Sequence, residues 1–182
     1  MAPYLYMVRH GKTPANADNK FAGRTDEPLS AQGREQIAEL VPRLAALHLD
    51  AIYAGPLLRT VQTAEIIADT AVPIHIAAGL IDIDLPHWDG LTKDEIRSQF
   101  GNEYPTWLTT PDLFHVQGCE DLHMVQERAV AEMNKIYAAH PCGNILLVTH
   151  LIVARCLILY KTGQPISMFR EIAVGNGEIV EL

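Results

Sequence analysis

At residues 4–13 the chain reads Tyr4-Leu5-Tyr6-Met7-Val8-Arg9-His10-Gly11-Lys12-Thr13, a short apolar run that ends in an arginine, a histidine and a glycine. The run favours β-structure and is too short for a helical period, which predicts a buried strand. An imidazole can act as a nucleophile, a guanidinium can hold an anion, and a glycine lets the backbone approach a ligand. The combination points to phosphoryl chemistry, although an ordinary exit from a strand into a loop has the same pattern.

Composition places the chain among ordinary globular proteins. It has 182 residues, of which 48% are hydrophobic and 20% charged, which predicts one domain over residues 1–182 with its own core. The formal net charge is -8 and the isoelectric point about 5.4, so no broad positive field would attract nucleic acid or an anionic membrane. Any anion site is therefore expected to be a local pocket of arginines.

The cysteines indicate a reducing compartment. Cys119, Cys142 and Cys156 share no spacing typical of a disulfide framework or a zinc site. No apolar run has the length of a membrane span, and the chain does not start with a basic region followed by an apolar one. The sequence predicts a soluble, cytoplasmic protein without a cofactor.

Strand and helix signals alternate along the chain. Further strands are predicted at 51–54, 74–76 and 145–149, and helices at 30–47 with a kink or break at Pro42, 56–68, 92–100, 120–139 and 151–160. Long loops are expected at 12–29 and 101–118, and two short strands near 172–174 and 178–180. This alternation predicts an α/β fold with a mostly parallel sheet.

Three polar side chains follow three of the predicted strands. His10 comes after the first strand, Arg59 lies in the first turn of the helix after the second, and His150 follows the strand at 145–149. Ligands of open α/β sheets bind beyond the carboxyl ends of the strands. We therefore expect the three side chains to meet at one edge of the sheet, where a helix N-terminus favours an anion.

The same residues carry a family resemblance. The stretch from Arg9 to Thr13, with Asn16 three residues on, resembles the signature of the histidine phosphatase superfamily, which includes cofactor-dependent phosphoglycerate mutases and small phosphatases. Matching blocks follow in the family's order at 23–30 with Gly33, 58–64, 88–92, 118–121 and 148–150. The resemblance spans nearly the whole chain and implies a phosphoglycerate mutase-like fold, a three-layer α/β/α arrangement with a mostly parallel central sheet.

The resemblance also implies a mechanism that agrees with the residue chemistry. A neutral His10 would attack phosphorus in line and form a phosphohistidine, which water then hydrolyses. Arg9, Asn16, Arg59 and a protonated His150 would hold the phosphate oxygens and stabilise their charge. These groups supply the positive charge, so no metal ion is implied, and no cluster of His, Asp and Glu has the spacing of a metal site.

The leaving oxygen needs a proton donor. Where the family pattern has a glutamate two residues after a leucine, this chain has Asp82, whose side chain is one methylene shorter. Asp82 is the expected acid and base, Asp84 and Asp89 are the alternatives, and a solvated loop carboxylate is the structural alternative. Two other departures concern the site: Pro86 replaces a usual glycine, and Leu151 stands where a glycine is common after the second histidine.

Two loop features have open interpretations. Arg24 could reach a substrate or remain solvated. Trp107 and Phe114 could form a lid that sets specificity, or could anchor the loop at 101–118 to the body.

The leading hypothesis is a metal-independent phosphomonoesterase that hydrolyses a small phosphorylated metabolite through a phosphohistidine on His10. One alternative is a phosphoglycerate mutase, which must retain the phosphoryl group and exclude water. Another is a phosphate-binding module with weak catalysis, suggested by the departures at Asp82, Pro86 and Leu151. Sugar phosphates, phosphoglycerates, nucleotide derivatives, a cobalamin precursor or a phosphoprotein would all suit such a pocket, and the sequence predicts no oligomeric state.

Overall fold

A five-stranded sheet forms the centre of the protein in a computed structural model that describes residues 3–68 and 72–182. Its strands lie in the order β3-β2-β4-β1-β5. Their bounds are Tyr4–Arg9 for β1, Ala51–Ala54 for β2, Ile74–Ile76 for β3, Asn144–Thr149 for β4 and Ile179–Glu181 for β5. The pairs among β1 to β4 are parallel and β5 runs antiparallel to β1, so the predicted mostly parallel sheet is confirmed.

Alternating side chains of the central strands divide the core into two halves. In β4, Ile145 and Leu147 belong to one core cluster, whereas Leu146 and Val148 belong to the other, and all four are fully buried. Successive side chains of a strand point to opposite faces, so a strand that is apolar at every position must be covered on both. β1 alternates in the same way.

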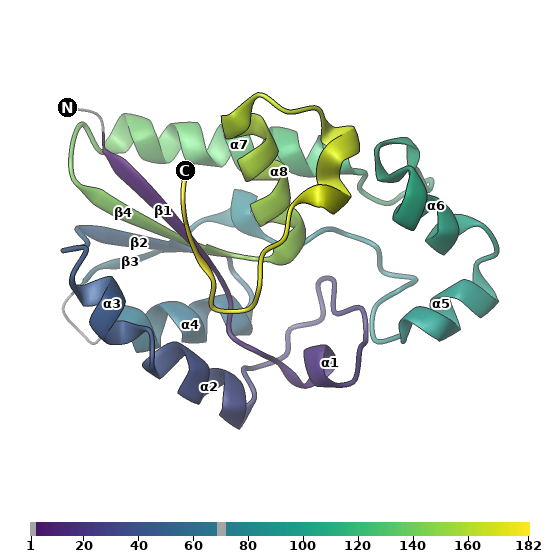
Figure 1. Cartoon of the computed structure of the whole chain (residues 1–182), viewed down its shortest axis with the longest axis horizontal. Coiled ribbons are helices and arrows are strands. Elements are labelled where there is room, and N and C mark those ends of the chain that lie inside the picture. Colours follow the sequence, from purple (N-terminus) through teal and green to yellow (C-terminus); the bar gives the residue numbers. More distant parts are fainter. Residues whose placement is uncertain (1–2, 69–71) are drawn as a thin grey trace.

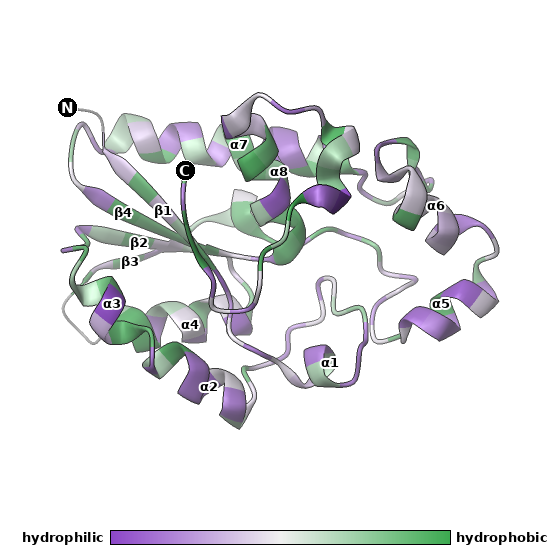
Figure 2. Cartoon of the chain, viewed as in Figure 1, coloured by the Kyte–Doolittle hydropathy of each residue, from purple (hydrophilic) through white to green (hydrophobic). Residues whose placement is uncertain are grey.

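Helices cover both faces of the sheet (Figure 1). On one face lie α7 (Leu122–Ala139) and α8 (Leu151–Thr162); on the other lie α2 (Ala31–Ala38), α3 (Val41–Ala45) and α4 (Leu58–Ala68). Figure 2 shows hydrophobic residues gathered along the strands and in α8. The three-layer α/β/α prediction is confirmed.

Prolines account for two features of the helices. Pro42 stands in the first turn of α3, and the helix predicted at 30–47 is interrupted between α2 and α3, as the sequence predicts. The loop predicted at 101–118 is wrong, because it contains α6 (Glu103–Thr109) and the 3-10 helix η2 (Pro111–Leu113). Pro105 is the third residue of α6, where its missing N–H costs no intrahelical hydrogen bond.

An aromatic cluster fixes α6 to the body of the protein. The Trp88 ring is fully buried and lies 6.0 Å from Trp107 and 5.2 Å from Phe114, measured between ring centroids. Trp88 also donates a hydrogen bond from Nε1 to Glu103 at 3.1 Å. The contacts favour the anchoring interpretation of Trp107 and Phe114. They join α6 to the segment before α5 (Lys93–Gln99).

Two further expectations need correction. The strand expected near 172–174 is wrong: this segment follows the 3-10 helix η3 (Ile166–Glu171) and is irregular. The loop at 12–29 contains the short helix α1 (Pro14–Ala17), which Thr13 caps.

Within 3–68 and 72–182, no helix is both long enough and apolar enough to cross a membrane.

Candidate active site

The three polar side chains at the strand ends lie together, as the sequence predicts. The backbone N–H of His10 donates to the carbonyl of Thr149 at 3.0 Å, which ties the end of β1 to the end of β4. The rings of His10 and His150 are 5.3 Å apart between centroids. Arg59, in the first turn of α4, donates from Nε to His150 Nδ1 at 3.2 Å. All three side chains are buried.

The hydrogen bonds of His10 determine its tautomer. Its Nδ1 lies 2.7 Å from the carbonyl oxygen of Gly11, which can only accept, so Nδ1 carries the proton. Burial, and then the positive charge of Arg59, lower the pKa of His10 well below its usual value. His10 is therefore neutral at pH 7, with an unprotonated Nε2, as a nucleophile requires.

His150 has the opposite arrangement of donor and acceptor. Its Nδ1 accepts from Arg59, so the neutral ring carries its proton on Nε2. This buried Nε2 has no hydrogen-bond partner among the described residues. Burial and then Arg59 lower the pKa of His150 well below its usual value. Burial and Arg59 thus favour a neutral His150, which offers an N–H donor from Nε2, and the protonated His150 stays a prediction.

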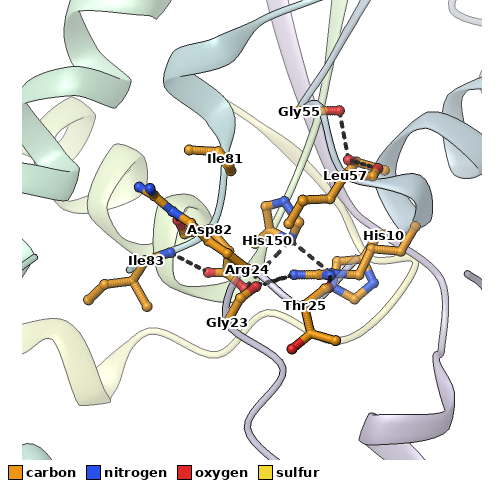
Figure 3. Close-up of polar contacts among 12 residues, drawn as sticks. His10, Gly23, Arg24, Thr25, Gly55, Leu57, Ile81, Asp82, Ile83 and His150 are labelled. Carbon is orange, nitrogen blue, oxygen red and sulfur yellow. Dashed lines mark hydrogen bonds and ion pairs between the residues drawn. The ribbon is translucent and has the colours of Figure 1, made fainter. Parts of the chain in front are cut away.

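Arg59 connects the loop at 12–29 to the site, through two loop residues, Gly23 and Thr25, that are labelled in Figure 3. Its guanidinium donates to the carbonyls of Gly23 at 2.6 Å and Thr25 at 2.7 Å, and lies 3.4 Å from the carboxylate of Asp82. The arginine is fully buried, and such a group needs partners for every donor. These contacts hold the loop at 12–29 against the ends of the strands.

Arg9 and Asn16 lie at the rim of the same site. Arg9 donates from Nη1 to the carbonyl of Val174 at 2.8 Å, and its buried Nε has no partner among the described residues. Asn16 Oδ1 accepts from the backbone of Thr13 at 3.2 Å and from Asn176 Nδ2 at 3.1 Å. The amide group of Asn16 therefore faces the site as a donor. Sequence reasoning treated Asn176 only as part of a turn.

Asp82 lies beside the two histidines. Its Oδ2 is 3.6 Å from His150 Nδ1, and its Oδ1 accepts from the backbone N–H of Ile83 at 3.0 Å. Burial raises the pKa of Asp82, although the nearby positive charge of Arg59 opposes the shift. A carboxyl group that keeps its proton to higher pH is suited to act as a general acid.

The two alternative acids have other partners. Asp84 forms an ion pair with Arg24 at 3.2 Å. Asp89 accepts from the backbone N–H of Arg24 at 3.2 Å, and burial raises its pKa to about 6. Neither carboxylate is among the described residues that line the cavity, whereas Asp82 is. The geometry therefore favours Asp82 as the acid.

Two guanidinium groups hold the backbone of the acid segment. Arg24 and Arg128 donate to the carbonyl of Asp82 at 3.2 Å and 3.1 Å. Glu120 lies between them, 3.1 Å from Arg24 and 2.8 Å from Arg128. Arg24 is thus paired with two acids and does not line the cavity, and its side chain is 32% exposed. This network fixes the backbone position of Asp82, and that position determines how far its short side chain extends into the cavity.

Of the expected site residues, Arg9, His10, Asn16, Arg59 and Asp82 line a cavity of about 340 Å³, whereas His150 is not among the described residues that line it. Leu151 lies in its wall, as expected from its place after His150, and so do residues that sequence reasoning missed as site residues, among them Tyr104, Arg155, Phe169 and Arg170. Arg155 had a sequence signal, because it is the only charged residue in the apolar run 151–160. Among the described residues, no three His, Cys, Asp or Glu side chains are placed to hold a metal ion.

Known proteins are similar to this chain in sequence and in fold. The sequence model of the histidine phosphatase superfamily (branch 1) matches residues 5–182. Phosphoserine phosphatase 1 of Hydrogenobacter thermophilus is 28% identical over 173 residues, which cover 94% of this chain and 82% of that protein. The probable phosphoglycerate mutase GpmB of Klebsiella pneumoniae is 33% identical over 183 residues, with 96% and 82% covered. The solved structure of Bacillus stearothermophilus YhfR has a TM-score of 0.94 at 32% identity, with 100% and 92% covered.

Proposed function

The chain belongs to the histidine phosphatase superfamily (branch 1) and is an enzyme of the phosphatase type; from this premise we propose that it hydrolyses a small phosphorylated metabolite through a phosphohistidine on His10. The observation that carries the proposal is the neutral His10, which lines the cavity, has its Nδ1 bonded to Gly11 and lies 5.3 Å from His150 between ring centroids. An unprotonated Nε2 facing a phosphate site is the arrangement that in-line attack needs.

The proposed reaction has two steps. In the first, a bond forms from His10 Nε2 to phosphorus, the bond to the leaving oxygen breaks, and Asp82 gives its proton to that oxygen. In the second, the Asp82 carboxylate takes a proton from water, which attacks the phosphohistidine and releases orthophosphate. His10 and Asp82 return to their starting protonation states.

Four side chains would bind the transferred phosphoryl group. Arg9 and Arg59 supply positive charge, and Asn16 and His150 supply N–H donors. Support comes from the unpartnered Arg9 Nε and His150 Nε2, both buried donors that a phosphate oxygen would satisfy. The proposed chemistry needs no metal ion, so we expect activity to persist in excess EDTA.

The test is hydrolysis of p-nitrophenyl phosphate with EDTA present. The unmodified protein should release orthophosphate, and acid-quenched samples should contain phosphohistidine. His10→Ala should lose both signals, whereas the matched control His123→Ala, on an exposed histidine of α7, should keep them. Turnover that survives His10→Ala would refute the phosphohistidine.

A mutase is the second candidate, because the GpmB protein of Klebsiella pneumoniae is named a probable phosphoglycerate mutase. Incubation with 3-phosphoglycerate separates the two functions. A phosphatase releases orthophosphate, whereas a mutase forms 2-phosphoglycerate without release. A binding module would do neither and would leave His10 unphosphorylated.

A further inference from the structure

The outer part of the cavity carries positive charge that the proposed phosphate site does not use. Arg155 comes from α8, and Arg170 comes from η3. The phosphate site itself lies at the ends of β1 and β4, around His10 and His150. Arg155 is five residues beyond His150, more than one helical turn along α8 from the end of β4. Arg155 and Arg170 thus reach the same cavity from other elements than those that carry His10 and Arg59.

Arg155 is held in place but has no anionic partner. Its guanidinium carbon lies 5.0 Å above the ring of Phe169, a cation–π contact that fixes the plane of the group. Its Nε is buried and has no hydrogen-bond partner among the described residues. Burial and the neighbouring charges of Arg170 and Arg9 lower the pKa of Arg155 to about 10. Arg9 and Arg170 line the same cavity as Arg155.

Other arginines of the protein show the contrast. Arg24, Arg97 and Arg128 each lie within 3.2 Å of an aspartate or glutamate. Among the residues that the structure describes, no carboxylate lies within 4.0 Å of Arg155 or Arg170. In a protein with a formal net charge of -8, unpaired arginines in the wall of one cavity indicate a negatively charged ligand.

We propose that Arg155, with Arg170 beside it, binds a carboxylate of the substrate, so that the substrate class is a small phosphorylated carboxylic acid. This inference rests on the proposed function, because it places the carboxylate in the same cavity as the phosphate bound near His10. The planar fork of a fixed guanidinium matches the two oxygens of a carboxylate. Phe169 beneath Arg155 keeps the plane of that fork in one orientation.

Two substrates that differ only in a carboxylate test the proposal. O-phosphoserine has this group and O-phosphoethanolamine lacks it. The unmodified protein should have a kcat/KM about 10- to 100-fold higher for phosphoserine, the range measured for losing one charged hydrogen-bond partner. Arg155→Gln should abolish most of this preference, because it should lower kcat/KM for phosphoserine far more than for O-phosphoethanolamine, which has no carboxylate.

Two further variants keep the result interpretable. Arg170→Gln changes a more exposed position and should reduce the same preference to a smaller extent. Arg43→Gln changes an exposed arginine of α3 and should leave it unchanged. An unmodified protein without preference for phosphoserine, or a preference that persists in Arg155→Gln, would overturn the proposal. A third outcome is that the protein shows no preference for phosphoserine but prefers glycerol 1,3-bisphosphate to glycerol 1-phosphate. That outcome would assign the subsite to a second phosphate and overturn the proposal of a carboxylate.

A binding measurement separates this inference from the proposed function. Calorimetric titration of His10→Ala with the two substrates reports carboxylate recognition without turnover. If His10→Ala binds phosphoserine more tightly than O-phosphoethanolamine, and the His10→Ala, Arg155→Gln double variant does not, the carboxylate subsite is supported. This holds even if the unmodified protein hydrolyses no ester. Equal affinities of His10→Ala for the two substrates would contradict it even if hydrolysis through His10 were established.

Discussion

Burial acts on Asp82 and His10 in the same physical way but moves their pKa values in opposite directions. Removing a group from water disfavours its charged form, so the pKa of the carboxyl rises and the pKa of the imidazole falls. For each residue, burial therefore favours the neutral form that the first proposed step needs: an unprotonated nucleophile and a protonated acid.

The first prediction concerns this acid. With an alkyl phosphate such as O-phosphoserine, kcat should fall as pH rises through the raised pKa of Asp82, because only the protonated carboxyl donates. Asp82→Asn should lower kcat by about 10²- to 10⁴-fold and remove that limb of the pH profile. The loss should be much smaller with p-nitrophenyl phosphate, whose leaving group needs little protonation.

Asp84→Asn is the matched control for the acid. It removes a carboxylate two residues away that is paired with Arg24, and the alkaline limb should remain. A limb that disappears in Asp84→Asn but remains in Asp82→Asn would reverse the assignment.

The second prediction concerns His150. A glutamine side chain can place a neutral N–H donor close to the position of His150 Nε2, whereas alanine cannot. His150→Gln should therefore keep more activity than His150→Ala, which should lose about 10²- to 10³-fold in kcat, the usual effect of removing one donor to a transition-state oxygen. Equal losses measured in steady-state kinetics would indicate that His150 acts through its charge.

At the scale of secondary-structure elements, α7 supports the acid segment through one side chain. Arg128 donates to the carbonyls of Gly79, Ile81 and Asp82 and pairs with Glu120. The side chains of Arg128 and Glu120 are 21% and 14% exposed, so water replaces these contacts poorly. The helix thus determines where the segment after η1 (Ala78–Leu80) lies.

The third prediction follows from this support. Arg128→Met should lower the free energy of unfolding by about 3 kcal/mol, because it leaves the carbonyls of Gly79 and Ile81 without their donor and leaves Glu120 with Arg24 as its one remaining arginine. It should also lower kcat more than it raises KM, since the acid segment loses its position. Urea unfolding and steady-state kinetics measure the two effects.

Arg97→Met is the control for Arg128. Arg97 also pairs with an acid, Asp94, at 3.1 Å, but the two side chains are 54% and 92% exposed. Its loss should change stability by less than about 0.5 kcal/mol. An effect as large as that of Arg128→Met would show that burial is not the cause.

At the scale of the whole molecule, the buried histidines make stability depend on pH. An unfolded chain protonates His10 and His150 near their usual pKa of 6.5, whereas the folded protein, with pKa values well below this, does not. The unfolded state therefore binds more protons as pH falls through 6.5, and stability decreases. Asp82 has the opposite sign: with its raised pKa, its stabilising contribution is complete below 3.8 and is lost as pH rises through the folded value.

The fourth prediction is a comparison of unfolding free energies between pH 7 and pH 5. Each buried histidine should contribute a loss that approaches about 1.4 kcal/mol for each pH unit below 6.5. His150→Gln should flatten the pH dependence by the contribution of one histidine, as measured by urea unfolding. His123→Gln should leave the dependence unchanged, and the same slope in both variants would contradict the assignment to buried imidazoles.

Much of the fold could be predicted because its signals are local. The strands at 51–54 and 74–76 have the predicted bounds, and Gly163 ends α8 with a φ of +67°. The helix at 103–109 was missed because proline, glycine and threonine around it indicated a loop, while its stability depends on Trp88, a residue outside it. The expected strand near 172–174 is irregular, and the carbonyl of Val174 accepts from the side chain of Arg9, a contact that local sequence does not indicate.

The sequence by itself determined the parallel sheet and the meeting of His10, Arg59 and His150, because the carboxyl ends of parallel strands share one edge wherever the rest of the chain lies. Only the tertiary structure decided which aspartate faces the cavity, that burial favours a neutral His150, and that Arg155 is unpaired. These properties depend on burial and on partners such as Arg59 and His150, which are 91 positions apart. A residue's pKa and free hydrogen-bonding capacity arise from neighbours that only folding brings together.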